Sequence, residues 1–129
     1  SAAEWGMTRH SNYGYYGVIQ STSGLEYRGL TTGTSPWATL NNWYHVVVTM
    51  SAAAGTLTVY LNGSSIGSSS SGSGARAGNT GSSPLTIGHY VNYDTNPTVN
   101  SFIGQITLLA FYSVALSPLR IAQHYNAMF

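Results

Sequence analysis

The chain of 129 residues contains no cysteine and no lysine, and it carries little charge of either sign. Without cysteine it can form no disulfide, no thiolate metal site and no cysteine nucleophile, and its compartment cannot be inferred from redox chemistry. Charged side chains make up 5% of the chain, against a norm of about 25%. The four basic residues are arginines scattered along the sequence. They form no basic stripe for phosphate contacts, so we expect no nucleic-acid partner.

Long apolar runs are also missing. No run approaches the roughly 20 residues of a membrane span, and the first residues lack the basic start and apolar core of a signal peptide. We therefore expect no membrane insertion, and we expect any export signal to lie outside this sequence.

Acidic side chains are too few for the usual hydrolytic chemistry of sugars. A glycoside hydrolase needs two carboxylates that face the same glycosidic bond, and the chain has only Glu4, Glu26 and Asp94, in three separate segments. The sequence also lacks a Gly-x-Ser-x-Gly nucleophile motif, and its four histidines have no paired spacing. We predict that the chain is not an enzyme and has no cofactor.

With so few charges, the surface must consist of serine, threonine, glycine, asparagine and tyrosine. These residues form hydrogen bonds without repelling a neighbouring copy, so such a surface suits a protein assembly or a glycan partner. The alternative is that the composition reflects only the habits of the host organism. The length fits one domain over residues 1–129, which can bury roughly two thirds of the surface of its unfolded chain.

Short strands dominate the sequence pattern. In Thr56–Leu61 the apolar side chains of Leu57, Val59 and Leu61 alternate onto one face, and Asn62-Gly63 predicts a type I′ hairpin turn. Trp43–Met50 is typical of a strand buried on both faces or nearly so. A further strong strand is predicted at Ile103–Tyr112, and weaker ones at Glu4–Arg9, Tyr15–Gln20, Leu25–Leu30 and Leu85–His89. The pattern indicates an all-β, antiparallel β-sandwich.

One short helix is predicted near the C-terminal end, over Ser117–Tyr125. Ser117 is placed as N-cap, Pro118 takes the first helical position, and Leu116 can pack onto Ile121 as a hydrophobic staple. Ser64–Ser83 consists mostly of serine and glycine, and for most of its length it is predicted to be a flexible connection between strands.

Four motifs occur in an order that resembles the laminin G-like and pentraxin-like branch of the concanavalin A-like sandwiches. They are Trp43-Tyr44-His45-Val46, Leu57-Thr58-Val59-Tyr60-Leu61-Asn62-Gly63, Leu85-Thr86-Ile87-Gly88, and Phe102-Ile103-Gly104-Gln105-Ile106 leading to Ala115-Leu116-Ser117. The resemblance covers Trp43–Tyr125 well and the first forty residues loosely. It implies a jelly-roll sandwich, in either a shortened form or a segment of a longer protein.

The C-terminal stretch Ala115–Tyr125 also looks like the ending of such modules in bacterial surface proteins and in bacteriophage tail or capsid proteins. Two departures from the family pattern matter. Thr107 occupies a position where the family commonly carries an acidic residue. Some members bind calcium through Asp and Asn on rim loops, but this chain has one Asp, so no metal site is carried over.

Aromatic side chains are the best candidates for binding. Ten tyrosines and three tryptophans offer flat faces for sugars or for protein contacts. The alternative is that they cap the sandwich core. The candidates for a glycan or partner site are Tyr13, Tyr15, Trp37, Tyr90, Tyr93 and Asp94.

Two polar residues have competing interpretations. Asp94 lies in a loop rich in oxygen donors, where an Asx-turn is favoured over calcium because one carboxylate binds calcium weakly. His45 shares a strand face with Trp43 and Val47. It is interpreted either as a ligand or, preferably, as a hydrogen-bonded core or rim histidine.

Two functions remain open at this point. The first is a structural module on the surface of a virion or an extracellular assembly, such as a phage capsid, tail or decoration protein, which packs against neighbouring subunits and contacts host glycans. The second is a carbohydrate-binding or adhesion module of a bacterial extracellular protein, in which weak sites gain avidity from many copies.

Overall fold

The structure is a computed structural model that describes residues 5–10, 14–21, 24–29, 41–51, 56–70, 87–88 and 103–128. Before residue 30, and at residues 69–70, it describes the backbone alone. The elements in chain order are β1 (Trp5–His10), β2 (Gly14–Ser21), β3 (Gly24–Gly29), β4 (Val46–Ser51), β5 (Thr56–Leu61), β6 (Ser64–Ser70) and α1 (Pro118–Met128).

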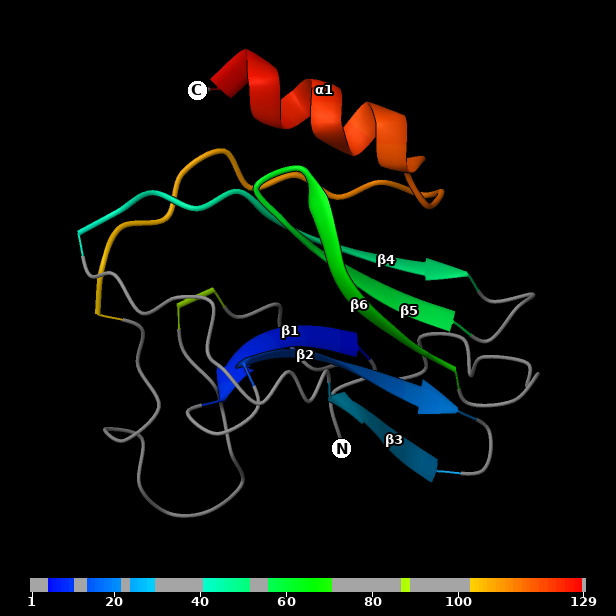
Figure 1. Ribbon diagram of the computed structural model, residues 1–129. Coiled ribbons are helices and arrows are strands. Elements are labelled where there is room, and N and C mark those ends of the chain that lie inside the picture. The colour runs from blue at the N-terminus through cyan, green and yellow to red at the C-terminus, as the bar shows by residue number, and fades with distance from the viewer. Residues whose placement is uncertain are drawn as a thin grey trace.

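The described strands form two antiparallel sheets, each a three-stranded meander, in the orders β1-β2-β3 and β4-β5-β6. The sheets meet where β2 contacts β5, and α1 lies on the other side of the second sheet (Figure 1). The predicted all-β sandwich with one C-terminal helix is therefore confirmed. Three of the weaker predicted strands are also present, as β1, β2 and β3, each shifted by no more than a residue or so.

The β5–β6 hairpin has the turn that its sequence predicts. Leu61 pairs with Ser64 across a two-residue turn, and both turn residues have positive φ, 49° at Asn62 and 79° at Gly63. This is the backbone that a type I′ turn requires. A flexible connection is predicted for most of Ser64–Ser83; its first residues, Ser64–Ser70, form the strand β6, and residues 71–83 lie outside the described part of the chain. Serine and glycine are tolerated there because the tight turn delivers the chain directly beside β5.

The core of the second sheet lies on one face of its central strand. Leu57 and Val59 are fully buried and form a cluster with the partly buried Val48 and Ile66. The ladder shifts register between Val59 and Tyr60, so that Ile66 is the extra residue of a β-bulge on β6. The alternation predicted for Thr56–Leu61 is confirmed, with Leu61 partly buried.

Two predicted strands differ from the structure. In β4 every residue is half-buried or exposed, so the predicted burial on both faces is wrong. The reason is that β4 lies at the edge of the described sheet, and the centre belongs to β5. The strand predicted at Ile103–Tyr112 is also wrong, since these residues form no ladder with the described strands. Leu108 has a left-handed φ of 53°, which breaks the strand alternation in the middle of this segment.

The helix begins as predicted and runs further than predicted. Ser117 caps its first turn, because the Arg120 backbone N–H donates to the Ser117 Oγ at 3.3 Å and the Ile121 N–H donates to the Ser117 carbonyl at 3.0 Å. Ile121, at 0% exposure, is the buried residue of this helix. Of the predicted strand Leu85–His89, only residues 87–88 are described, and they form a bend.

Candidate functional site

Most residues predicted to bind glycans or partners lie outside the described part of the chain. Tyr13, Trp37, Tyr90, Tyr93 and Asp94 belong to this group. The backbone of Tyr15 is described and pairs with Arg9 between β2 and β1. The aromatic site therefore stays a prediction.

A different candidate is an apolar surface formed by the segment between residue 103 and residue 114, which we call the 103–114 surface. Its most exposed side chains are Ile103, at 98%, and Leu108, at 73%. Its other exposed large apolar residues are Ile106, Leu109, Phe111, Tyr112 and Val114. A monomer seldom exposes so many large apolar side chains in one continuous segment without a partner for them.

Residues 87–88 lie beside this surface. A Cβ built on Gly88 would lie 3.8 Å from Ile106 Cδ1, and the neighbouring Ile87 side chain is itself more than half exposed. The exposed apolar area is therefore wider than the segment alone. Sequence reasoning missed it because Ile103–Tyr112, rich in large apolar residues, is predicted to be a strand inside a sheet. The same residues are exposed when no described strand pairs with them.

The charge of this region is unusual as well. No Asp, Glu, Lys or Arg occurs between Asp94 and Arg120. Residues 103–114 therefore carry no formal charge that could attract or repel a partner. The surface can therefore bind by apolar burial and by hydrogen bonds from its backbone, its hydroxyl groups and the Gln105 amide, but not through a formal charge.

A second group of residues joins the helix to the tip of the β5–β6 hairpin, and we call it the histidine junction. It consists of His45, Asn62, Gly63, His124 and Tyr125. The Asn62 N–H donates to the His45 carbonyl at 2.8 Å, and the His45 N–H donates to Asn62 Oδ1 at 3.0 Å. This reciprocal pair fixes His45 beside the turn.

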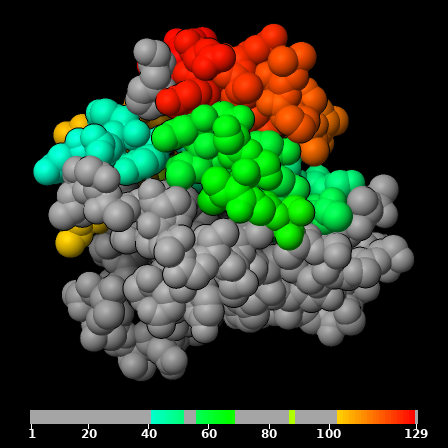
Figure 2. All heavy atoms as spheres, viewed as in Figure 1, coloured from blue at the N-terminus to red at the C-terminus, as the bar shows by residue number. Residues whose placement is uncertain are grey.

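The hairpin tip lies in very close contact with the helix. A Cβ on Gly63 would lie 3.2 Å from both Cβ and Cδ1 of Tyr125, and 3.3 Å from Cα of Ala122. Glycine is thus required at this position both by its positive φ and by the approach of α1. Figure 2 shows α1, in orange to red, lying directly on the hairpin, in green.

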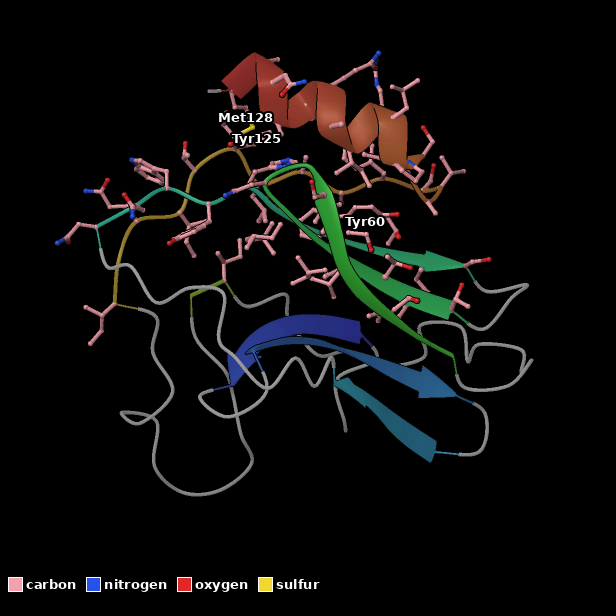
Figure 3. All side chains as sticks on the ribbon, in the orientation of Figure 1. Tyr60, Tyr125 and Met128 are labelled. Atoms are coloured by element: carbon pink, nitrogen blue, oxygen red, sulfur yellow. The ribbon has the colours of Figure 1, made fainter. Side chains whose placement is uncertain are left out.

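Aromatic rings complete the junction. The ring centroids of His45 and Tyr125 are 6.2 Å apart in a stacked arrangement, and those of Tyr112 and His124 are 6.0 Å apart. Figure 3 shows Tyr125 and Met128 on the side of α1 that faces the sheet. Two of the four histidines therefore lie at one helix interface, although they are far apart in the sequence.

His45 is partly buried, and its Nδ1 atom is inaccessible and has no hydrogen-bond partner within the described structure. The preferred interpretation of His45 as a hydrogen-bonded histidine is not met at Nδ1, and the hydrogen bonds described for this residue are made by its backbone. Burial lowers the pKa of His45 below its ordinary value, and electrostatic repulsion from the nearby His124 lowers it further. Both effects favour the neutral imidazole.

The described side chains offer little to bind an ion. Among them, no three His, Asp or Glu residues come together in a way that could hold a metal. None of the helical structure described in the chain is long and apolar enough to cross a membrane.

The two described sheets with a single packed helix define a β-sandwich. The family described as the concanavalin A-like lectin/glucanases superfamily, in its laminin G type, matches residues 2–122. The chain belongs to this family, as its four ordered motifs indicate.

Comparison with solved structures supports the same fold. A crystal structure of an S-layer domain-containing protein (residues 221–444) from Clostridium thermocellum ATCC 27405 is similar, with a TM-score of 0.55 and 20% sequence identity. The match covers 97% of this chain and 64% of that chain, so the present sequence spans under two thirds of the solved structure. No curated protein matches the chain.

Proposed function

We propose that the chain is a non-catalytic module of an extracellular surface assembly, in which copies of the chain pack against one another through the 103–114 surface. The observation that carries the proposal is the continuous exposure of large apolar side chains there. Burying such side chains is the main driving force of protein association.

The lack of charge supports a second copy of this chain as the occupant. A partner that relied on charge would find none on residues 103–114 to complement. Two copies of an uncharged segment, by contrast, can meet without repulsion. A contact between two copies of the same surface, related by a two-fold axis, would also be the same for both subunits.

The setting we propose is a cell surface or a virion surface. Membership of a family that includes lectins and the similarity to a protein named for its S-layer domain both favour the outside of a cell. A bacteriophage capsid or tail, like a cell-surface layer, is built from repeated copies of a subunit. A contact between copies through the 103–114 surface would therefore suit either setting.

The non-catalytic part of the proposal concerns carboxylates. The family name includes glucanases, and sugar hydrolysis ordinarily needs two carboxylates across one bond. The three acidic residues Glu4, Glu26 and Asp94 come from three separate segments. We expect no release of reducing sugar from β-glucans, and hydrolysis that is abolished by Glu26→Gln or Asp94→Asn would contradict this part.

The second candidate is a carbohydrate-binding module, favoured by the family's lectins and by the predicted aromatic site. It can be tested on a glycan array with the multimerised chain. Binding that is lost in Trp37→Ala or Tyr93→Ala would establish it. If no glycan is bound, or if both variants bind like the parent, the glycan-binding proposal fails.

Self-association is tested by sedimentation over a wide range of protein concentration. The informative variant is Leu108→Asn, because asparagine tolerates the left-handed φ of residue 108 and removes an exposed apolar side chain. The matched control is Leu119→Asn, in which a leucine of similar exposure on α1 (71%) is replaced.

We expect the parent chain and the control to associate with the same dissociation constant. Leu108→Asn should raise that constant about tenfold, the factor that corresponds to 1.4 kcal/mol. A chain that stays monomeric at millimolar concentration, or an equal effect of the two variants, would overturn the assembly proposal.

A further inference from the structure

We propose that the histidine junction is a pH-sensitive latch, in which protonation of His45 in mildly acidic solution releases helix α1 from the tip of the β5–β6 hairpin. The latch concerns the docking of the helix and does not rest on the assembly proposed above.

The first argument is the environment of the imidazole. His45 is held beside the turn by its two backbone hydrogen bonds with Asn62, and its ring stacks on Tyr125 of α1. Its Nδ1 atom is buried and has no partner among the residues that the structure describes. In imidazolium both ring nitrogens carry a hydrogen that must be donated. A charged donor that is buried without an acceptor is strongly disfavoured.

The second argument is that the described side chains around His45 offer no compensating negative charge. The described elements around His45 carry these titratable or charged groups: Tyr44 on its own segment, Tyr60 on β5, Tyr112 before the helix, and Arg120, His124 and Tyr125 on α1. None of them is a carboxylate, and no Asp or Glu occurs among the side chains that the structure describes. Protonation of His45 would therefore place a positive charge beside a helix that carries Arg120, with no carboxylate among the described side chains to offset it.

The sign of the pH dependence follows from linkage. The pKa of His45 is lowered in the docked state, by burial first and by His124 second, whereas a released His45 would titrate near 6.5. The docked state therefore binds fewer protons than the released state. The contribution of His45 to helix docking is fully present above about pH 6.5. It decreases as the pH falls below that value, and it no longer changes once the pH is below the pKa of His45 in the docked state.

Release has a defined structural consequence. Ile121 is the fully buried residue of α1, and the close approach of Gly63 to Ala122 and Tyr125 exists only while the helix is docked. Undocking would expose Ile121. A probe at that position therefore reports the latch directly.

The chain has no cysteine, so a single introduced thiol gives an unambiguous signal. We would compare Ile121→Cys with Leu119→Cys, an exposed position on the same helix. The measurement is the rate of reaction of each variant with 4,4′-dithiodipyridine at pH 7.5 and pH 5.0. Dividing the two rates at each pH removes the intrinsic effect of pH on the thiol and gives the protection of position 121.

We expect this protection to fall at least fivefold between pH 7.5 and pH 5.0. In the background His45→Phe, which keeps an aromatic ring but cannot titrate, it should change by less than a factor of two. His124→Gln should retain part of the pH effect, because it removes the repulsion and leaves the burial. Gly63→Ala should lower the protection already at pH 7.5, since its new Cβ pushes against the helix.

Three results would overturn the proposal. The first is protection that does not change with pH in the parent background. The second is an equal change in His45→Phe. The third is protection that rises in acid, which would show that attraction of the imidazolium to the Tyr125 ring outweighs its burial. If Ile121→Cys does not fold, amide hydrogen exchange of residues 121–128 in the unmodified chain, corrected for intrinsic rates, gives the same three readings.

Discussion

Ile121 is the residue whose truncation should separate the packing of the helix from its intrinsic stability. Its side chain is 0% exposed, whereas Leu119, two positions earlier on α1, is 71% exposed. Replacing a buried isoleucine by alanine removes apolar contacts and leaves a cavity, at a cost of about 2–5 kcal/mol. The milder Ile121→Val should cost about 0.5–1.5 kcal/mol, and Leu119→Ala should stay within about 0.5 kcal/mol of the parent.

The assay is urea unfolding followed by far-UV circular dichroism, with the free energy of unfolding obtained by linear extrapolation. A domain of this size has a free energy of unfolding of roughly 5–15 kcal/mol, so the loss in Ile121→Ala can be measured. If the parent chain lies at the low end of this range, Ile121→Val is measured instead. Equal losses for Ile121→Ala and Leu119→Ala would refute the reasoning. They would mean that α1 is not held by burial of this side chain.

Two further predictions concern single contacts. Gly63→Ala and Gly88→Ala both place a side chain at positive φ, 79° and 73°, but only Gly63 has neighbours at 3.2 Å. Gly63→Ala should therefore lower the free energy of unfolding by about 1–3 kcal/mol more than Gly88→Ala, as measured by thermal or urea unfolding. Equal losses would show that Gly63 does not contact α1 closely. Ser117→Ala should lower the free energy of unfolding by about 1 kcal/mol, because it removes the N-cap hydrogen bond. Ser113→Ala, which replaces an exposed serine outside the helix, should leave it unchanged. The same unfolding curves measure both variants, and equal values would contradict the capping role of Ser117.

Much of the architecture could be predicted because it is encoded by local patterns. The alternation of Leu57 and Val59, the Asn62-Gly63 turn and the Ser117-Pro118 start of the helix each involve a few neighbouring residues. Each specifies its backbone through sterics or hydrogen bonding within one turn. These features appear in the structure with nearly the predicted bounds.

The candidate sites depend on contacts between distant segments, which a local pattern does not contain. His45 and Tyr125 are eighty positions apart, and nothing in either neighbourhood indicates that their rings stack. The apolar residues of Ile103–Tyr112 are equally compatible with a central strand and with an exposed binding segment. The glycine of the turn was the one local hint of the contact with the helix. The hairpin turn alone explains why residue 63 is glycine, so nothing in the sequence indicates that Gly63 also packs against α1.

The central claim is that the chain assembles through the 103–114 surface, and concentration-dependent hydrogen exchange tests it most directly. Peptide-resolved exchange would be compared at protein concentrations tenfold below and tenfold above the measured association midpoint. If copies associate through this surface, residues 103–114 exchange more slowly at high concentration, whereas β5 and α1 are unchanged. Protection that appears elsewhere, or exchange in residues 103–114 that is the same at both concentrations, would contradict it.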